Sequence, residues 1–139
     1  MEYFLNDEQK TLKSLARRIA EERILPVRAE LDEKEEFPWD LIREMASSDL
    51  LRVFIPAEYE GLGGGCLDLC LVIEELSRVC GGVAISYAAN ALGVLPLILY
   101  GSDAQKKKYL PAVAGGSRLA AFAVTEATAG SDASAIRTS

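Results

Sequence analysis

The residues best suited to contact a ligand lie near the end of the chain, where an uncharged run, 119–125, passes into a loop of small and polar residues, 126–135. Gly130 has no side chain and can adopt a positive φ, so a ligand can approach the backbone closely at this position. Thr125 and Ser131 supply hydroxyl groups, and the N–H groups of such a loop are free to point at an anion. The residue types alone therefore indicate a loop that could bind a phosphate group or a cofactor.

The chain has few residues for acid–base or metal chemistry. It contains no histidine, which excludes Ser-His and Cys-His catalysis within its 139 residues. Its three cysteines, Cys66, Cys70 and Cys80, form no Cys-x-x-Cys pair, so we expect neither a zinc site nor a disulfide framework. Cys66 and Cys70 could lie one helical turn apart, but buried, reduced thiols are the expectation. Acid–base chemistry, if the protein is an enzyme, must come from carboxylates, a cofactor or residues outside this chain.

Length, composition and charge describe an ordinary globular domain. The 139 residues suffice for one domain with its own core, and half of them are apolar. The net charge of -6 argues against a nucleic-acid-binding surface, which needs a basic face. The N-terminus has no basic segment followed by an apolar core, so we expect no secretory signal and a cytoplasmic protein.

Apolar residues at helical spacing predict two helices in the first third of the chain. Asn6 and Gln9 form a capping-box pattern, and the amphipathic helix that they begin is interrupted at Pro26. Pro38 suits the first turn of a second helix, because its missing N–H has no intrahelical partner there. The apolar side chains of this second helix are Leu41, Ile42 and Met45.

A glycine-rich stretch separates these helices from the next one. Residues 61–65 include four glycines, which breaks the helical pattern and predicts a long loop. The stretch lacks the Gly-Lys-Ser/Thr ending of a nucleotide-binding P-loop, so we do not assign it that function. A third helix is expected to begin at Asp68, with Glu74, Glu75 and Arg78 facing solvent or a partner.

The stretch 79–102 carries no charged residue and is long enough to cross a bilayer. Small and polar residues dilute its hydrophobicity, and Pro96 divides it into two pieces. We therefore expect a central helix buried on nearly all sides rather than a transmembrane span. Its small residues could leave space for an apolar ligand or allow close packing of helices.

The last elements are a helix and a strand. Ser102 and Gln105 form a second capping-box pattern, and the helix that follows contains Pro111 near its end. The small and apolar residues of 119–125 suit a strand that is buried on both faces. The predicted architecture is an all-α helical bundle with a short β segment at the C-terminus.

The same C-terminal residues resemble a known family. The motif Ala123-Val-Thr-Glu126, two further residues and then Ala129-Gly-Ser-Asp132 resembles the first sequence signature of the acyl-CoA dehydrogenases. The resemblance continues through 55–63, 90–93 and 100–110 and covers essentially the whole chain. It implies that 1–118 form the N-terminal helical domain of this family and that 119–139 form the first strand and flavin loop of its middle β-domain.

The resemblance also implies which residues contact FAD. The position of Thr125 hydrogen-bonds the pyrimidine edge of the flavin ring, and Phe122 and Val124 lie along that ring. Gly130 and Ser131 meet the FAD pyrophosphate, and Ser131 also approaches the acyl-CoA substrate.

Further positions are implied to line the acyl pocket or to support the loop. Ala88, Leu92 and Leu95 would contact the acyl chain, and Glu126 would be structural. The family usually has Pro-Gly after this glutamate, whereas Ala127 and Thr128 stand here, which departs from the family pattern in the flavin loop.

The reaction implied is α,β-dehydrogenation of an acyl-CoA thioester in fatty acid metabolism, with FAD reoxidised by an electron-transfer flavoprotein. Enzymes of this family are longer and homo-oligomeric, and their remaining domains carry the catalytic glutamate. We therefore expect no catalytic residue in this chain, which would be the N-terminal part of such an enzyme and inactive alone. The alternatives are a non-catalytic helical binding or oligomerisation module and an acyl-CoA oxidase fragment.

Overall fold

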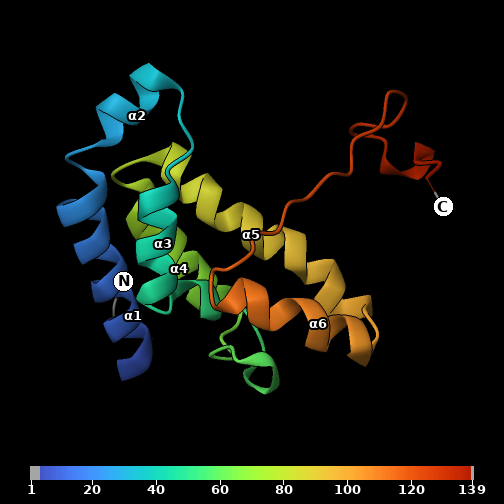
Figure 1. Cartoon of the computed structure of the whole chain (residues 1–139), viewed down its shortest axis with the longest axis horizontal. Coiled ribbons are helices and arrows are strands. Elements are labelled where there is room, and N and C mark those ends of the chain that lie inside the picture. Colours follow the sequence, from blue (N-terminus) through green and yellow to red (C-terminus); the bar gives the residue numbers. More distant parts are fainter. Residues whose placement is uncertain (1–3, 139) are drawn as a thin grey trace.

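The computed structural model describes residues 4–138. Residues 1–3, where we expect no secretory signal, and residue 139, the end of the predicted β segment, lie outside the described residues. The described part is built from helices and contains no strand, with a C-terminal segment that runs outward from the helices (Figure 1). Its α-helices are α1 (Asp7–Ile19), α2 (Arg28–Lys34), α3 (Trp39–Ser47), α4 (Cys66–Ser77), α5 (Gly81–Tyr100) and α6 (Asp103–Ala114).

Both predicted capping boxes are confirmed. At the start of α1, the Asn6 side chain accepts a hydrogen bond from the Gln9 N–H (2.8 Å), and the Gln9 side chain accepts one from the Asn6 N–H (3.2 Å). Ser102 and Gln105 form the same pair of bonds at the start of α6. α1 continues into a π-helical turn, Ala20–Ile24, and helical structure then stops close to the predicted break.

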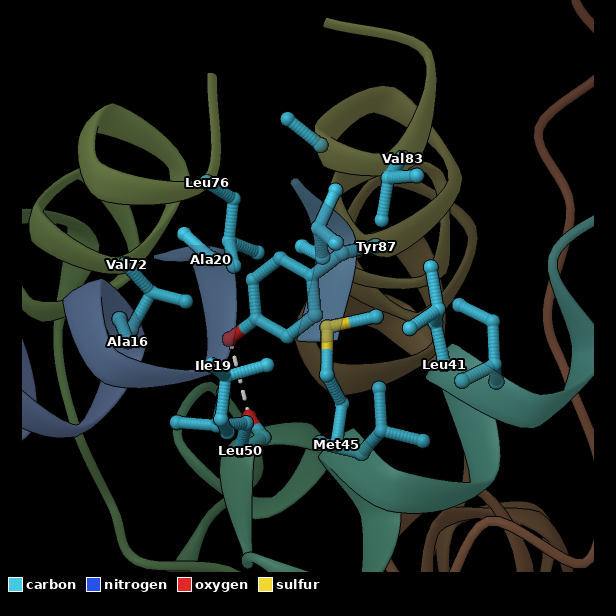
Figure 2. Packing of buried hydrophobic residues seen from close by; sticks show 14 of the residues in the cluster. Ala16, Ile19, Ala20, Leu41, Met45, Leu50, Val72, Leu76, Val83 and Tyr87 are labelled. Atoms are coloured by element: carbon cyan, nitrogen blue, oxygen red, sulfur yellow. Dashed lines mark hydrogen bonds between the residues drawn. The ribbon is translucent and has the colours of Figure 1, made fainter. Parts of the chain in front are cut away.

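The main hydrophobic core lies between α1, α3, α4 and α5, around the ring of Tyr87 (Figure 2). Tyr87 is fully buried, and its hydroxyl donates a hydrogen bond to the Leu50 carbonyl oxygen (2.9 Å). Burial raises the pKa of this hydroxyl, so Tyr87 stays neutral. A second cluster joins α6 to α5 and to the segment around Ile55 and Tyr59.

We expect Tyr87→Phe to lower the free energy of unfolding by about 1 kcal/mol, because it removes a buried hydrogen bond while keeping the ring in place. Urea denaturation followed by circular dichroism would measure the loss. Tyr109→Phe is the matched control, since Tyr109 is exposed on α6. Equal stabilities of the two variants would show that the Tyr87 hydroxyl contributes nothing.

α5 differs from the prediction in two ways. It is not buried on nearly all sides, since Ile85, Leu99 and Tyr100 are 68%, 59% and 88% exposed. Pro96 does not divide it either, because the helix runs unbroken from Gly81 to Tyr100 and the proline ring lies on an exposed face. α5 is long and apolar enough to cross a membrane, a criterion that the core helix of a soluble protein also meets. One side of α5 therefore builds the core and the other side carries exposed apolar residues.

α4 begins two residues before the predicted start. Gly65 is the N-cap residue. The carboxylate of Asp68, in the first turn, accepts a hydrogen bond from the Gly65 N–H (2.7 Å) and so stabilises the N-terminus of the helix. Glu75 was expected to face solvent or a partner but is only 2% exposed, since it packs against α1 and pairs with Arg17.

The uncharged run 119–125 is extended, but it pairs with no other strand within residues 4–138. The prediction that it is buried on both faces is wrong for this chain, since Phe122 and Val124 are 48% and 47% exposed. A strand needs a neighbour for its backbone groups and for its side chains, and the described residues supply none. The β-type pairing present is an isolated bridge between Glu126 and Ala129.

Candidate functional site

An apolar groove of about 530 Å³ lies between α4, α5 and the glycine-rich loop. We call it the α4–α5 groove. All three residues that the resemblance implied for the acyl pocket, Ala88, Leu92 and Leu95, lie on it. Its lining consists of Phe54, Pro56, Ala57, Gly63, Gly64, Gly65, Cys66, Leu69, Ile73, Ala88, Ala91, Leu92, Leu95 and Ile98.

Small residues create the space in this groove. Ala88 and Ala91 place only a methyl group on the face of α5 that lines it, whereas Leu92 and Leu95 stand half exposed. A Cβ atom on Gly64 would lie 2.5 Å from the Val53 carbonyl oxygen, so only glycine fits there without displacing the loop. The glycine-rich loop thus forms a close-packed wall of backbone along one side of the groove.

The C-terminal segment crosses α5 at a fixed point, which we call the Asn90–Gly93 anchor. The buried Asn90 side chain accepts a hydrogen bond from the Ala120 N–H (2.9 Å) and donates one to the Ser86 carbonyl oxygen (3.0 Å). One turn further, a Cβ atom on Gly93 would lie 2.7 Å from the Ala121 nitrogen, so the two backbones touch. The anchor sets where the segment leaves α5.

The residues implied for FAD follow this anchor, and all of them are exposed: Phe122, Val124, Thr125, Gly130 and Ser131. None of them lines the α4–α5 groove. Gly130 does not use the positive φ that was considered for it, and the space where its Cβ would lie is open within 4 Å. Within residues 4–138, the hydroxyls of Thr125 and Ser131 make no hydrogen bond, and neither do the backbone groups of 121–125.

Glu126 closes the C-terminal loop on itself. Its carboxylate accepts hydrogen bonds from the N–H groups of Arg137 (3.0 Å) and Thr138 (2.9 Å) and from the Thr138 hydroxyl. These bonds, the Thr138 hydroxyl first, lower the pKa of this carboxyl below its ordinary value. The side chain has a structural task in this loop, as the resemblance implied.

The prediction that the cysteine thiols are buried is wrong. Cys66 and Cys70 are exposed, Cys80 is half-buried, and all three are free thiols. The buried residues of α4 are Leu71, Val72, Glu75 and Leu76, and helical spacing from them places Cys70 on the far side of the helix. That spacing was the available signal against buried thiols. No local sequence pattern shows that Cys66 lines the groove, because the groove is formed by the packing of α4 against α5 and the glycine-rich loop.

Comparison with known proteins identifies the family. The family model for the N-terminal domain of acyl-CoA dehydrogenases matches residues 6–117. A probable acyl-CoA dehydrogenase of Mycobacterium tuberculosis, FadE25, is 42% identical over 134 residues, which are 96% of this chain and 34% of that protein.

Two solved structures are similar throughout the chain. An acyl-CoA dehydrogenase from Bacillus anthracis complexed with FAD has a TM-score of 0.87 and 37% identity, covering 96% of this chain and 23% of that chain. The butyryl-CoA dehydrogenase of Megasphaera elsdenii has a TM-score of 0.88 and 34% identity, covering 99% of this chain and 37% of that chain. The present chain spans about a third of the length of the curated relatives that it matches. By sequence and by fold, it belongs to the acyl-CoA dehydrogenase family and contains the N-terminal domain of that family.

Proposed function

We propose that this chain is the N-terminal part of a flavin-dependent acyl-CoA dehydrogenase, an oxidoreductase that introduces an α,β double bond into an acyl-CoA thioester. The observation that supports it best is the α4–α5 groove, which is apolar, about 530 Å³ in volume and lies on the helix that anchors the C-terminal segment. In this proposal the chain supplies one half of the acyl-CoA and FAD site. The matched relative is about three times as long, and in this proposal the remaining two thirds of such an enzyme supply the other half of the site.

The groove is suited to binding the acyl chain. Leu92 and Leu95 offer apolar contact, and Ala88 leaves room for methylene groups. Each methylene removed from water contributes about 0.8 kcal/mol to binding. The lining contains no carboxylate, so the base that removes the α-proton is assigned to other residues of the dehydrogenase.

The segment after the Asn90–Gly93 anchor fits a flavin cofactor. Phe122 and Val124 present exposed apolar side chains to a ring, and Thr125 offers an uncommitted hydroxyl to its polar edge. Gly130 leaves the backbone accessible, and Ser131 adds a hydroxyl for the pyrophosphate. When bound, FAD supplies the acceptor for the hydride that leaves the β-carbon.

We expect the affinity for acyl-CoA to rise with chain length, at least about tenfold from butyryl-CoA to octanoyl-CoA, because added methylenes are buried in the groove. Isothermal titration calorimetry would measure it, with coenzyme A alone as the reference ligand. Ala88→Phe should abolish this length dependence by filling the groove. Ala89→Phe is the matched control, since Ala89 lies on the same helix outside the lining. Octanoyl-CoA binding that survives Ala88→Phe would contradict the assignment.

We expect Thr125→Val to weaken FAD binding about tenfold in the flavin-bearing protein, because one hydrogen bond to the ring is lost. Flavin fluorescence during titration would report the affinity. Thr128→Val is the control, because Thr128 lies exposed in the same loop and has no assigned contact. Purified protein that never acquires flavin absorbance would favour the non-catalytic binding module.

The partners follow from the same proposal. An electron-transfer flavoprotein is proposed as the electron acceptor, and reoxidation by dioxygen instead would identify an acyl-CoA oxidase. A homo-oligomer is proposed as well, and the exposed apolar residues Ile85, Leu99 and Tyr100 on α5 support further packing on this helix. A cytoplasmic location and the domain boundary at 118 stay predictions.

A further inference from the structure

Two thiols lie close together at the beginning of α4. Cys66 is the first residue of the helix, Cys70 follows one turn later, and both side chains are exposed. Residues four apart on a helix lie on the same face, so the two thiols are neighbours rather than isolated surface cysteines. The third cysteine, Cys80, lies beyond the end of α4 and is half-buried.

Only one member of this pair reaches the α4–α5 groove. Cys66 lines it together with Leu69, Leu92 and Leu95, whereas Cys70 and Cys80 do not line it. Apart from this sulfur, the lining consists of hydrocarbon side chains and backbone, so Cys66 is the nucleophilic side chain that an occupant of the groove meets. An apolar molecule held by the groove is therefore brought close to a free thiol.

We infer that Cys66, assisted by Cys70, is a covalent modification site for hydrophobic α,β-unsaturated carbonyl compounds that enter the α4–α5 groove. The Cys66 sulfur, as thiolate, adds to the β-carbon and forms a C–S bond. The electron pair of the C=C bond moves to the α-carbon, which then takes up a proton. The product is a saturated thioether that contains every atom of both reactants, so the step needs no oxidant, reductant or leaving group.

Cys70 is suited to supplying that proton. Although Cys70 is exposed, partial desolvation of its thiol and, after it, the neighbouring Cys66 thiol raise its pKa, which favours the protonated form. A protonated thiol one turn from the attacking sulfur can stabilise the thiolate by donating to it and can release a proton to the adduct. Cys66 is then the nucleophile and Cys70 its partner.

The choice of electrophile rests on the proposed function, because dehydrogenation of an acyl-CoA yields an α,β-unsaturated thioester. The same groove would then select for an alkyl chain on the electrophile. Modification of Cys66 would fill the groove and block the entry of another acyl chain.

The test uses crotonaldehyde, hexenal and decenal as probes, which share the enal group and differ in chain length. The purified chain is treated with each probe, and adducts are located by peptide mass spectrometry over time. Cys66 should react at least about tenfold faster with decenal than with crotonaldehyde, because the groove binds the longer chain. The rate at Cys80 should change much less. Cys66→Ser should remove the length-dependent adduct, and Cys70→Ser should slow it severalfold.

The outcomes separate this site from the proposed function. Rates at Cys66 that do not depend on chain length, or that equal those at Cys80, would overturn the inference. Length-dependent labelling that octanoyl-CoA fails to slow would support the modification site and count against the acyl-CoA assignment. Octanoyl-CoA binding by calorimetry without length-dependent labelling would support the assignment and overturn the modification site.

Discussion

Gly93→Ala should release the C-terminal segment from α5 without unfolding the helices. The added Cβ would lie 2.7 Å from the Ala121 nitrogen, 2.8 Å from its carbonyl oxygen and 2.8 Å from the Ala120 Cβ, which is closer than real contacts of such atoms. α5 is held by the core on its other side, whereas 121–125 make no hydrogen bonds within residues 4–138. The segment, rather than the helix, has to move.

Gly93→Ala should lower the local stability of the C-terminal segment and leave the global stability of the helices nearly unchanged. Hydrogen exchange at the Ala120 amide should become about tenfold faster, because the bond to Asn90 is lost with the displacement. The free energy of unfolding should change by less than about 1 kcal/mol, because the preference of alanine over glycine in a helix offsets the loss of the bond to Asn90. In the flavin-bearing protein, FAD affinity should fall as well, because the flavin residues follow the anchor.

Gly82→Ala is the matched control in the same helix. The nearest atom to a Cβ there is the Cys80 sulfur at 3.9 Å, an ordinary contact. This variant should leave exchange at Ala120 unchanged. Unchanged exchange at Ala120 in Gly93→Ala would show that the backbones tolerate the methyl group and that the anchor is not the constraint inferred here.

Features encoded within a few neighbouring residues could be predicted from the sequence. The starts of α1 and α6 follow from side chains that bond to the backbone three residues away, at Asn6 and at Ser102. The glycine-rich loop was also predicted, although its close approach to Val53 was not. That approach depends on backbone positions that a composition pattern does not contain.

Features that depend on distant partners were less predictable. An apolar run indicates residues that avoid water, but it does not say which neighbours will cover them. Thus Ile85 and Leu99 on α5 are exposed although their sequence context predicted burial. For 119–125 the composition suits a strand, yet strand pairing needs a second strand that the described residues lack.

The residues of the candidate site were also predictable only in part. The resemblance implied Ala88, Leu92 and Leu95, and the structure brings these three together on one groove. The contribution of Cys66 to that groove, and the role of Asn90 in fixing Ala120, join residues far apart in the chain. Neither leaves a local signal, because each depends on how elements pack.

Glu75→Gln should destabilise the protein by about 2 kcal/mol, because its carboxylate joins α4 to α1 through hydrogen bonds to charged groups. Arg17 donates to both carboxylate oxygens, at 2.8 and 3.0 Å, and Arg78 donates at 3.2 Å. Lys13 lies 3.5 Å from the same carboxylate. The carboxylate is almost completely buried although the arginines are partly exposed, so the lost bonds are only partly replaced by water.

Glu74→Gln provides the control for this variant. Glu74 lies on the same helix, is 60% exposed and has Lys13 at 3.7 Å. Exposed pairs of this kind contribute at most about 1 kcal/mol, so Glu74→Gln should change stability much less. Urea denaturation at neutral pH would compare the two variants, and equal losses would contradict a special role for Glu75.

The pH dependence separates charge from packing at this site. Burial alone would raise the pKa of the Glu75 carboxyl, but the bonds and charges of Arg17, Arg78 and Lys13 outweigh it, so the pKa is lower than the ordinary 4.5. The stabilisation is therefore complete above pH 4.5 and is lost as the pH falls through the lowered value. The stability difference between the natural chain and Glu75→Gln should shrink as the pH falls below 4.5. A difference that stays constant with pH would assign the loss to the altered packing of the glutamine, since a neutral amide does not titrate.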